Sequence, residues 1–141
     1  MPSTSNPAIP YPALTDAPSG PAQMQAIAVA VNALLADTGW VNLTLAAGSG
    51  TCRYRQIGPT VMIDISATGQ SVASGSTAVA IVASGGLPAA ARPTDGVYLA
   101  ANFGGSVVGL GAIGTNGSIS ALNNSGSTVT TVRISGSYLA G

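Results

Sequence analysis

The sequence predicts a mainly β protein: an antiparallel β-sandwich of the jelly-roll kind, preceded by an extended N-terminal arm and one α-helix. Three observations support this. Short alternating runs rich in β-branched residues recur at roughly ten-residue spacing from Trp40 onward, with turn residues between them. An apolar stripe at helical spacing precedes these runs, and a proline-rich opening precedes the stripe.

The chain has 141 residues, of which 46% are hydrophobic and only 6% are charged. This length suits one domain with an appendage, so we assign residues 1–37 to the arm and helix and residues 38–141 to the sandwich. A free-standing soluble protein normally carries far more surface charge. We therefore expect copies of the same chain to cover much of the surface.

The charge balance excludes several classes of protein. Four Arg and four Asp give zero net charge, without Lys, Glu or His, so we expect no nucleic-acid binding. No run approaches the ~20 apolar residues of a membrane span, so we expect no membrane insertion. The single cysteine, Cys52, excludes an internal disulfide framework, and we interpret it as a buried, inert thiol on the apolar face of a strand.

The first 20 residues form the predicted arm. Four prolines between positions 7 and 18 remove backbone donors and disfavour helix, so this segment is expected to be extended or irregular. Its largest apolar side chains stand on a mostly polar background, and we predict that they attach the arm to a larger body. They are Ile9, Tyr11 and Leu14.

The helix is predicted to start near Pro21, which suits a first turn, and to end at Asp37-Thr38-Gly39. Apolar residues at three- and four-residue steps form a stripe over about four turns. The contacts that we predict for an oligomer helix are Met24, Ile27, Val31 and Leu34. The alternative is a helix that only covers one end of its own sheet.

The first strands are predicted as a meander over residues 40–45, 51–57 and 60–66. If Gly58-Pro59 forms a two-residue loop, Arg53 lies opposite Asp64 on a polar face, while Tyr54 lies opposite Ile63 on an apolar face. A slip of one residue would move every side chain to the wrong face. The turn and the pattern therefore predict the same hairpin.

Further strands follow the meander. They are predicted at residues 76–84, 96–103, 106–113, 118–122, 128–135 and 137–139. Gly85-Gly86 and the proline-flanked crossing from Leu87 to Pro93 interrupt pairing, and Asn116-Gly117 is a strong hairpin turn signal.

The sequence offers little for chemistry. Without His or Glu the usual general bases are missing, and the four aspartates stand far apart, so we expect no enzyme, no metal and no cofactor. The run Gly109–Gly114 matches a dinucleotide-binding fingerprint in letters only, because a hairpin turn follows it instead of a helix. These glycines are expected to thin the strand faces or to allow chains to approach closely.

Several short motifs resemble those of a known group of proteins. Trp40, the run Tyr54–Gly58, Leu87-Pro88, Arg92-Pro93 and Asn116-Gly117 together resemble the tip domains of tailed-phage fibres and receptor-binding proteins. This resemblance covers most of the chain from Trp40 onward.

Two positions depart from the pattern of that group, because Gln56 stands where a basic residue is common and Ala91 where an aromatic one is. Both leave fewer groups to grip a ligand. Residues 12–28 are similar to the N-terminal attachment segments of phage minor tail and head-fibre proteins.

Two functions compete on this basis. The first is a non-enzymatic virion structural protein of a bacteriophage: a homotrimeric tail fibre, minor tail or capsid-decoration component on the particle surface, anchored to other virion proteins by its arm. The second is a receptor-binding tip that recognises a host cell-surface saccharide. The candidate contacts with a partner or receptor are Trp40, Arg55 and Arg92. Each also has a structural interpretation. Trp40 is then an anchor at a core or interface, and the two arginines pair with carbonyls and carboxylates at strand ends.

Overall fold

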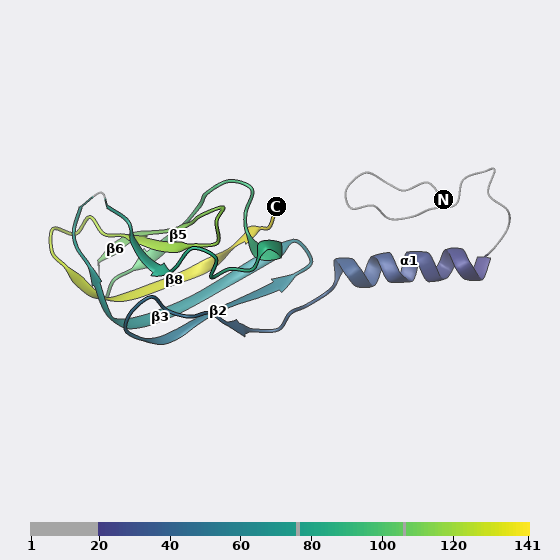
Figure 1. Cartoon of the computed structure of the whole chain (residues 1–141), viewed down its shortest axis with the longest axis horizontal. Helices are drawn as coiled ribbons and strands as arrows, with labels where there is room; N and C mark the ends of the chain where they lie inside the picture. The colour runs from purple at the N-terminus through teal and green to yellow at the C-terminus, as the bar shows by residue number, and fades with distance from the viewer. Residues whose placement is uncertain (1–19, 76, 106) are drawn as a thin grey trace. The chain divides into compact units, whose positions relative to one another are not determined.

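The computed structural model describes residues 20–75, 77–105 and 107–141, and the chain forms two compact units, Met1–Asp37 and Thr38–Gly141 (Figure 1). The predicted arm, with Ile9, Tyr11 and Leu14, lies outside the described residues. Its attachment role stays a prediction.

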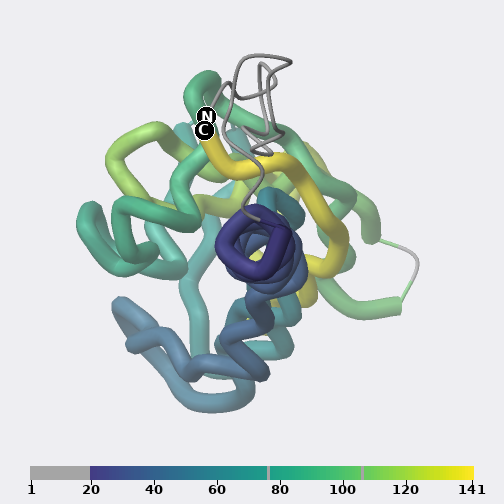
Figure 2. Tube along the Cα trace, turned by 90° about the vertical axis from the view of Figure 1, so that its right-hand side faces the viewer, coloured from purple at the N-terminus to yellow at the C-terminus, as the bar shows by residue number. Residues whose placement is uncertain are grey.

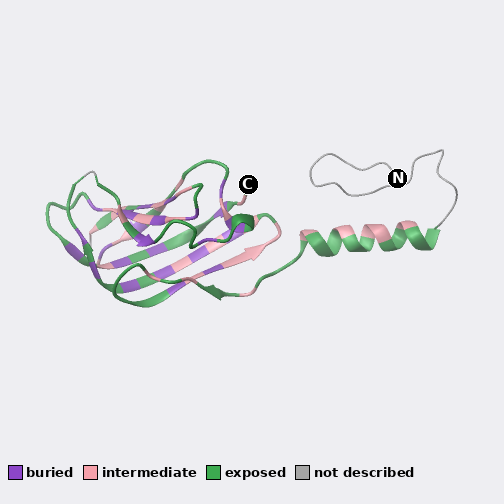
Figure 3. Ribbon diagram, viewed as in Figure 1, coloured by how far each residue is buried: buried purple, intermediate pink, exposed green. Residues whose placement is uncertain are grey.

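One helix, α1 (Gly20–Leu34), forms where the apolar stripe predicts it. None of its residues is buried, and Figure 3 shows it exposed or half-buried along its whole length. Among the predicted oligomer contacts, Met24 is 69% and Val31 is 39% exposed, whereas Ile27 and Leu34 are half-buried. The helix by itself thus buries none of its apolar side chains.

The second unit is a curled eight-stranded sheet in which every strand pairing is antiparallel, and the predicted mainly β fold class is confirmed. The strands are β1 (Val41–Asn42), β2 (Ser49–Ile57), β3 (Thr60–Val72), β4 (Val79–Val82), β5 (Val97–Asn102), β6 (Val108–Ile113), β7 (Ile119–Leu122) and β8 (Val129–Leu139). Their order in the sheet is β1-β2-β3-β8-β5-β6-β7-β4. A short 3-10 helix, η1 (Ala89–Ala91), lies in the crossing from β4 to β5.

The sheet curls until its two ends approach each other. Strands β2, β3 and β8 form one side and β5 and β6 the other (Figure 1), and Figure 2 gives the end-on view. The backbone N–H of Ala46, in the β1–β2 connection, donates to the carbonyl of Ile81 in β4 at 2.8 Å. The sequence predicts a strand over residues 40–45, but β1 contains only Val41–Asn42. The bond to Ile81 explains the difference, because the chain turns from β2 towards β4 after Leu43.

A single hydrophobic cluster fills the inside of the curl. Buried and exposed residues alternate along β3 and β8, as Figure 3 shows, because successive side chains of a strand point to opposite faces. The largest fully buried side chains are those of Ile65, Ile81, Leu87, Ile113, Ile119 and Ile134. Strands from both sides of the curl thus share one core.

The hairpin of β2 and β3 has the predicted register. Arg53 pairs with Asp64 and Tyr54 pairs with Ile63, and Gly58 supplies the left-handed turn conformation with a φ of 55°. Tyr54 and Ile63 are buried, while Arg53 and Asp64 lie on the outer face. Turn position and side-chain alternation were sufficient to predict this register, because both are properties of a short stretch of sequence.

Two glycines of β6 leave room for core side chains. A Cβ at Gly109 would lie 2.1 Å from the ring of Phe103, and one at Gly111 would lie 2.8 Å from Cγ2 of Ile134. Phe103 and Ile134 therefore pack directly on the backbone of β6, which confirms that these glycines thin a strand face. β6 runs into a turn and then into β7, so the dinucleotide-binding alternative is not supported.

The last strand is longer than the sequence predicts. β8 continues through Gly136 to Leu139 as one strand, where the sequence predicts two pieces, because β3 pairs with it from Thr60 to Thr68. The Asn116-Gly117 turn joins β6 to β7 as predicted, with Gly117 at a φ of 81° and its N–H bonded to the carbonyl of Gly114 at 2.9 Å.

Candidate functional site

A small polar and aromatic group lies on the outer face where β1, β2 and β3 meet. Nε and Nη2 of Arg53 both lie 2.8 Å from Oδ2 of Asp64, and the guanidinium carbon lies 4.7 Å from the centre of the Trp40 ring. The Trp40 side chain is 43% exposed, so it does not belong to the core. The aromatic ring, held by a cation–π contact, remains open to a partner.

The candidate Arg55 belongs to the same region. Val41 pairs with Tyr54, so Trp40 and Arg55 occupy neighbouring positions at the start of β1 and near the end of β2. Arg55 is half-buried and lies on the outer face, two residues from Arg53. The structure therefore brings two of the three predicted contact residues together.

The third candidate, Arg92, has a structural role in the crossing between β4 and β5. Its Nε donates to the carbonyl of Leu87 at 2.9 Å, and its own carbonyl accepts from the N–H of Gly141 at 2.8 Å. Gln56 supports the same segment, because its Nε2 donates to the carbonyl of Ala90 at 3.0 Å. Arg92 thus matches the interpretation in which arginine pairs with carbonyls at strand ends.

The pair of Arg53 and Asp64 makes a quantitative prediction. Their side chains are 39% and 37% exposed, so water screens the attraction and we expect a coupling energy of only about 0.2–1 kcal/mol. A double-mutant cycle of Arg53→Gln and Asp64→Asn, followed by urea unfolding, measures this coupling. It should shrink further in 1 M salt. A coupling that salt leaves unchanged would argue against a screened surface pair.

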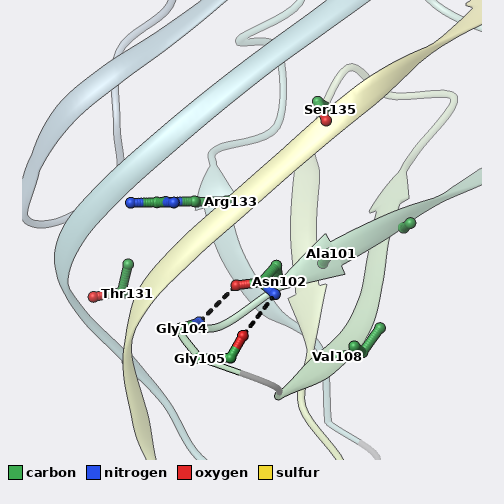
Figure 4. A pocket seen from close by; sticks show the side chains of 9 residues that line it. Ala101, Asn102, Gly104, Gly105, Val108, Thr131, Arg133 and Ser135 are labelled. Carbon is green, nitrogen blue, oxygen red and sulfur yellow. Dashed lines mark hydrogen bonds between the residues drawn. The ribbon is translucent and has the colours of Figure 1, made fainter.

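A second candidate site is a hollow of about 750 Å³ on the outer face where β5 and β8 meet. Figure 4 shows Thr131, Arg133 and Ser135 along β8, with Asn102 at the end of β5. Gly104, Gly105, Val108, Ala100 and Ala101 complete the lining. Asn102 is already engaged, because its Oδ1 accepts from the N–H of Gly104 at 2.9 Å and its Nδ2 donates to the carbonyl of Gly105 at 3.3 Å.

Sequence reasoning missed Arg133, which supplies the charge of this hollow. The signal was present in the alternation Thr131, Arg133, Ser135, which places three polar side chains on one face of a strand. The neighbour across the sheet could not be read from the sequence, because Asn102, which pairs with Arg133, lies 31 positions earlier in the chain.

Burial raises the pKa of two groups on the inside of the sheet. Desolvation, and secondarily the charge of Asp64, raises the pKa of the Cys52 thiol from 9.0 to about 11. Desolvation, and secondarily Tyr54, raises the pKa of Tyr138 from 10.0 to about 12, and its hydroxyl donates to the carbonyl of Ala91 at 2.6 Å. Both are buried packing groups, and the thiol has the inert environment that the sequence predicts.

These shifts predict how stability depends on pH. A thiol whose folded pKa is about 11 stays protonated while the unfolded thiol ionises near 9, so its contribution is complete below pH 9 and is lost as the pH rises towards 11. We expect the free energy of unfolding to fall across this window, and Cys52→Ala to reduce the slope. At pH 8 the native thiol should react with a thiol reagent far more slowly than the unfolded chain. Rapid labelling without unfolding would contradict a buried thiol.

Among residues 20–75, 77–105 and 107–141, no group of three or more His, Cys, Asp or Glu side chains could hold a metal ion. Within the same residues, no helix is long and apolar enough to cross a membrane.

Comparison with known proteins gives a likeness to solved structures. No protein-family model matches the chain, and no curated protein matches it. A solved structure, the head domain of the lactococcal phage bIL170, from a study of receptor-binding domains of lactococcal phages, is similar at a TM-score of 0.53 and 19% sequence identity. The match covers 73% of this chain and 98% of that domain. The β unit thus has the fold of a phage head domain.

Proposed function

We propose that this chain is a non-enzymatic structural protein of a tailed-phage virion, and that its β unit is a projecting head that contacts the host surface. The observation that carries the proposal is the fold likeness, which extends over 98% of a phage head domain. The short motifs around Trp40, Tyr54-Arg55 and Asn116-Gly117 support it, as does a composition with few charges. The likeness to a receptor-binding head favours a tail component over a capsid decoration.

In this proposal the two units have different tasks. Residues 1–37 attach the protein to other virion proteins through Ile9, Tyr11 and Leu14, and the apolar side chains of α1 pack against those of symmetry mates in a homotrimer. The apolar stripe of α1 supports this, because a helix with such a stripe gains most of its stability from a partner that covers it.

The contact with the host is assigned to the group formed by Trp40, Arg53 and Arg55. An exposed aromatic ring with guanidinium groups beside it can stack on a sugar ring and donate hydrogen bonds to its hydroxyls. Arg92 is less suitable, because it lies in the crossing between β4 and β5, where it bonds to the carbonyl of Leu87, whereas the guanidinium over the Trp40 ring is that of Arg53. We therefore place saccharide recognition at the β1–β2 corner.

Labelled protein tests the proposal on whole particles and on cells. Antibodies against residues 38–141 should decorate one end of the tail, and purified protein should bind host cells and block phage adsorption. Trp40→Ala should weaken cell binding about tenfold or more, as loss of an aromatic anchor does. Leu139→Ala is the matched control, since that side chain is 68% exposed on another part of the sheet. Unlabelled particles, or protein that neither binds cells nor competes, would refute the proposal.

A further inference from the structure

The outer face of β5 and β6 is apolar and uncharged. Paired residues of antiparallel strands point to the same side. The outward row consists of Tyr98, Ala100 and Asn102 on β5 and Val108, Leu110 and Ala112 on β6, which we call the β5–β6 face. Tyr98, Val108 and Leu110 are 66%, 68% and 46% exposed. The sequence has no charged residue from position 96 to 132, and exposed apolar groups on such a surface mark an interaction site.

Opposite charges stand at the two ends of this face. Asp95 lies two residues before β5 begins, and Arg133 pairs with Asn102, the last residue of β5. Both are exposed, and neither takes part in an ion pair within the described part of the chain, where Arg53 and Asp64 form the salt bridge. The length of β5 from Val97 to Asn102 separates their levels, roughly 16 Å for five residue steps of a strand, so the two charges cannot meet within one copy.

We infer that the β5–β6 face is a contact between copies of this chain, in which Asp95 of one copy enters the Arg133 hollow of the next. Complementary charges at the two ends of one face favour a second copy over a foreign partner, because each copy carries both halves of the pair. Tyr98, Val108 and Leu110 lose water between them in the same contact. The inference rests on the homo-oligomeric part of the proposed function and adds the surface that mediates it.

The hollow suits a carboxylate. Arg133 provides the guanidinium, and the hydroxyls of Thr131 and Ser135 flank it on the same side of β8. With about 750 Å³ the hollow has room for an incoming loop. A pair buried by the contact is screened less than the exposed pair of Arg53 and Asp64.

Charge reversal on the full-length chain tests the pairing. Arg133→Asp and Asp95→Arg should each raise the dissociation constant of the oligomer about tenfold in sedimentation equilibrium, and the double reversal should return it to within about threefold of the wild type. Both sites are exposed, so circular dichroism should show unchanged folding in all three variants. Equal weakening by the double reversal would overturn the inference.

A cross-link gives a second readout that α1 cannot mask. Cysteines at positions 95 and 133 are too far apart to bond within one chain, because a disulfide needs Cα atoms within about 7 Å. The double variant Asp95→Cys with Arg133→Cys should therefore give covalent oligomers on a non-reducing gel, whereas Asp95→Cys with Thr44→Cys should not. Equal cross-linking of both pairs, or of neither, would refute the contact.

The failures of the inference and of the proposed function can be told apart. A wild-type chain that sediments as a monomer at micromolar concentration would refute the homo-oligomer itself. A stable oligomer that ignores every change at positions 95 and 133 would refute only this face.

Discussion

A chain that begins at Thr38 is expected to fold and yet to be absent from virions. The β unit from Thr38 onward contains the eight strands of the described residues, their core cluster and the bond between Ala46 and Ile81 that joins the two ends of the sheet. It should give a β-rich circular dichroism spectrum and one cooperative melting transition. Particles produced without the native protein should take up the full-length chain but not the truncated one, a complete loss of incorporation.

The control separates folding from attachment. An isolated arm would lose about 1–2 kcal/mol of backbone entropy per ordered residue, so it should become ordered only against a larger body. A full-length variant with Ile9, Tyr11 and Leu14 changed to Ser should fold normally and also fail to incorporate. If the truncated chain joined particles as well as the complete one, attachment would lie on the β unit.

The substitution Ile134→Ala should cause the largest loss of stability among single changes in the core, about 2–5 kcal/mol. Ile134 is fully buried on β8, where it pairs with Ile65 of β3 and Ala101 of β5, and it also packs against the backbone of Gly111. Its side chain thus joins both sides of the curl, and its removal leaves a cavity that rigid strands cannot close. Urea unfolding should show a lower midpoint with an unchanged slope.

Two further variants make this result specific. Leu139→Ala, on the same strand but 68% exposed, should change the free energy of unfolding by no more than about 0.5 kcal/mol. Gly111→Ala alone should destabilise, because its Cβ would lie 2.8 Å from Cγ2 of Ile134. Combined with Ile134→Ala, the same methyl occupies part of the cavity and should restore some stability. Additive losses would contradict this packing.

The host contact and the contact between copies are proposed for different regions of the outer surface. Trp40, Arg53 and Arg55 lie at the β1–β2 end of the sheet order, whereas Arg133 lies on β8 and the β5–β6 face lies beyond it. Variants at one region should therefore leave the other function intact, so Trp40→Ala should still assemble, and Arg133→Asp should still bind host cells through the group around Trp40.

Local patterns in the sequence determined much of this protein. The helix, the turn at Gly58-Pro59, the Asn116-Gly117 turn and the register that places Arg53 opposite Asp64 all follow from spacings of a few residues. Alternation decides which side chains of a strand share a face, and a turn of defined length decides which residues lie opposite each other. Such features can be predicted without knowing which distant segments of the chain lie nearby.

Only the tertiary structure decided which distant strands became neighbours. β8 lies between β3 and β5, although about 60 residues separate it from β3 in the chain, and this placement produces the hollow at Arg133. The early end of β1 likewise depends on the curl that brings Ala46 to Ile81. The physical reason is that these long-range pairings are selected by the burial of one common core. Because apolar burial is non-directional, no short stretch of sequence encodes which strand a given strand will pair with.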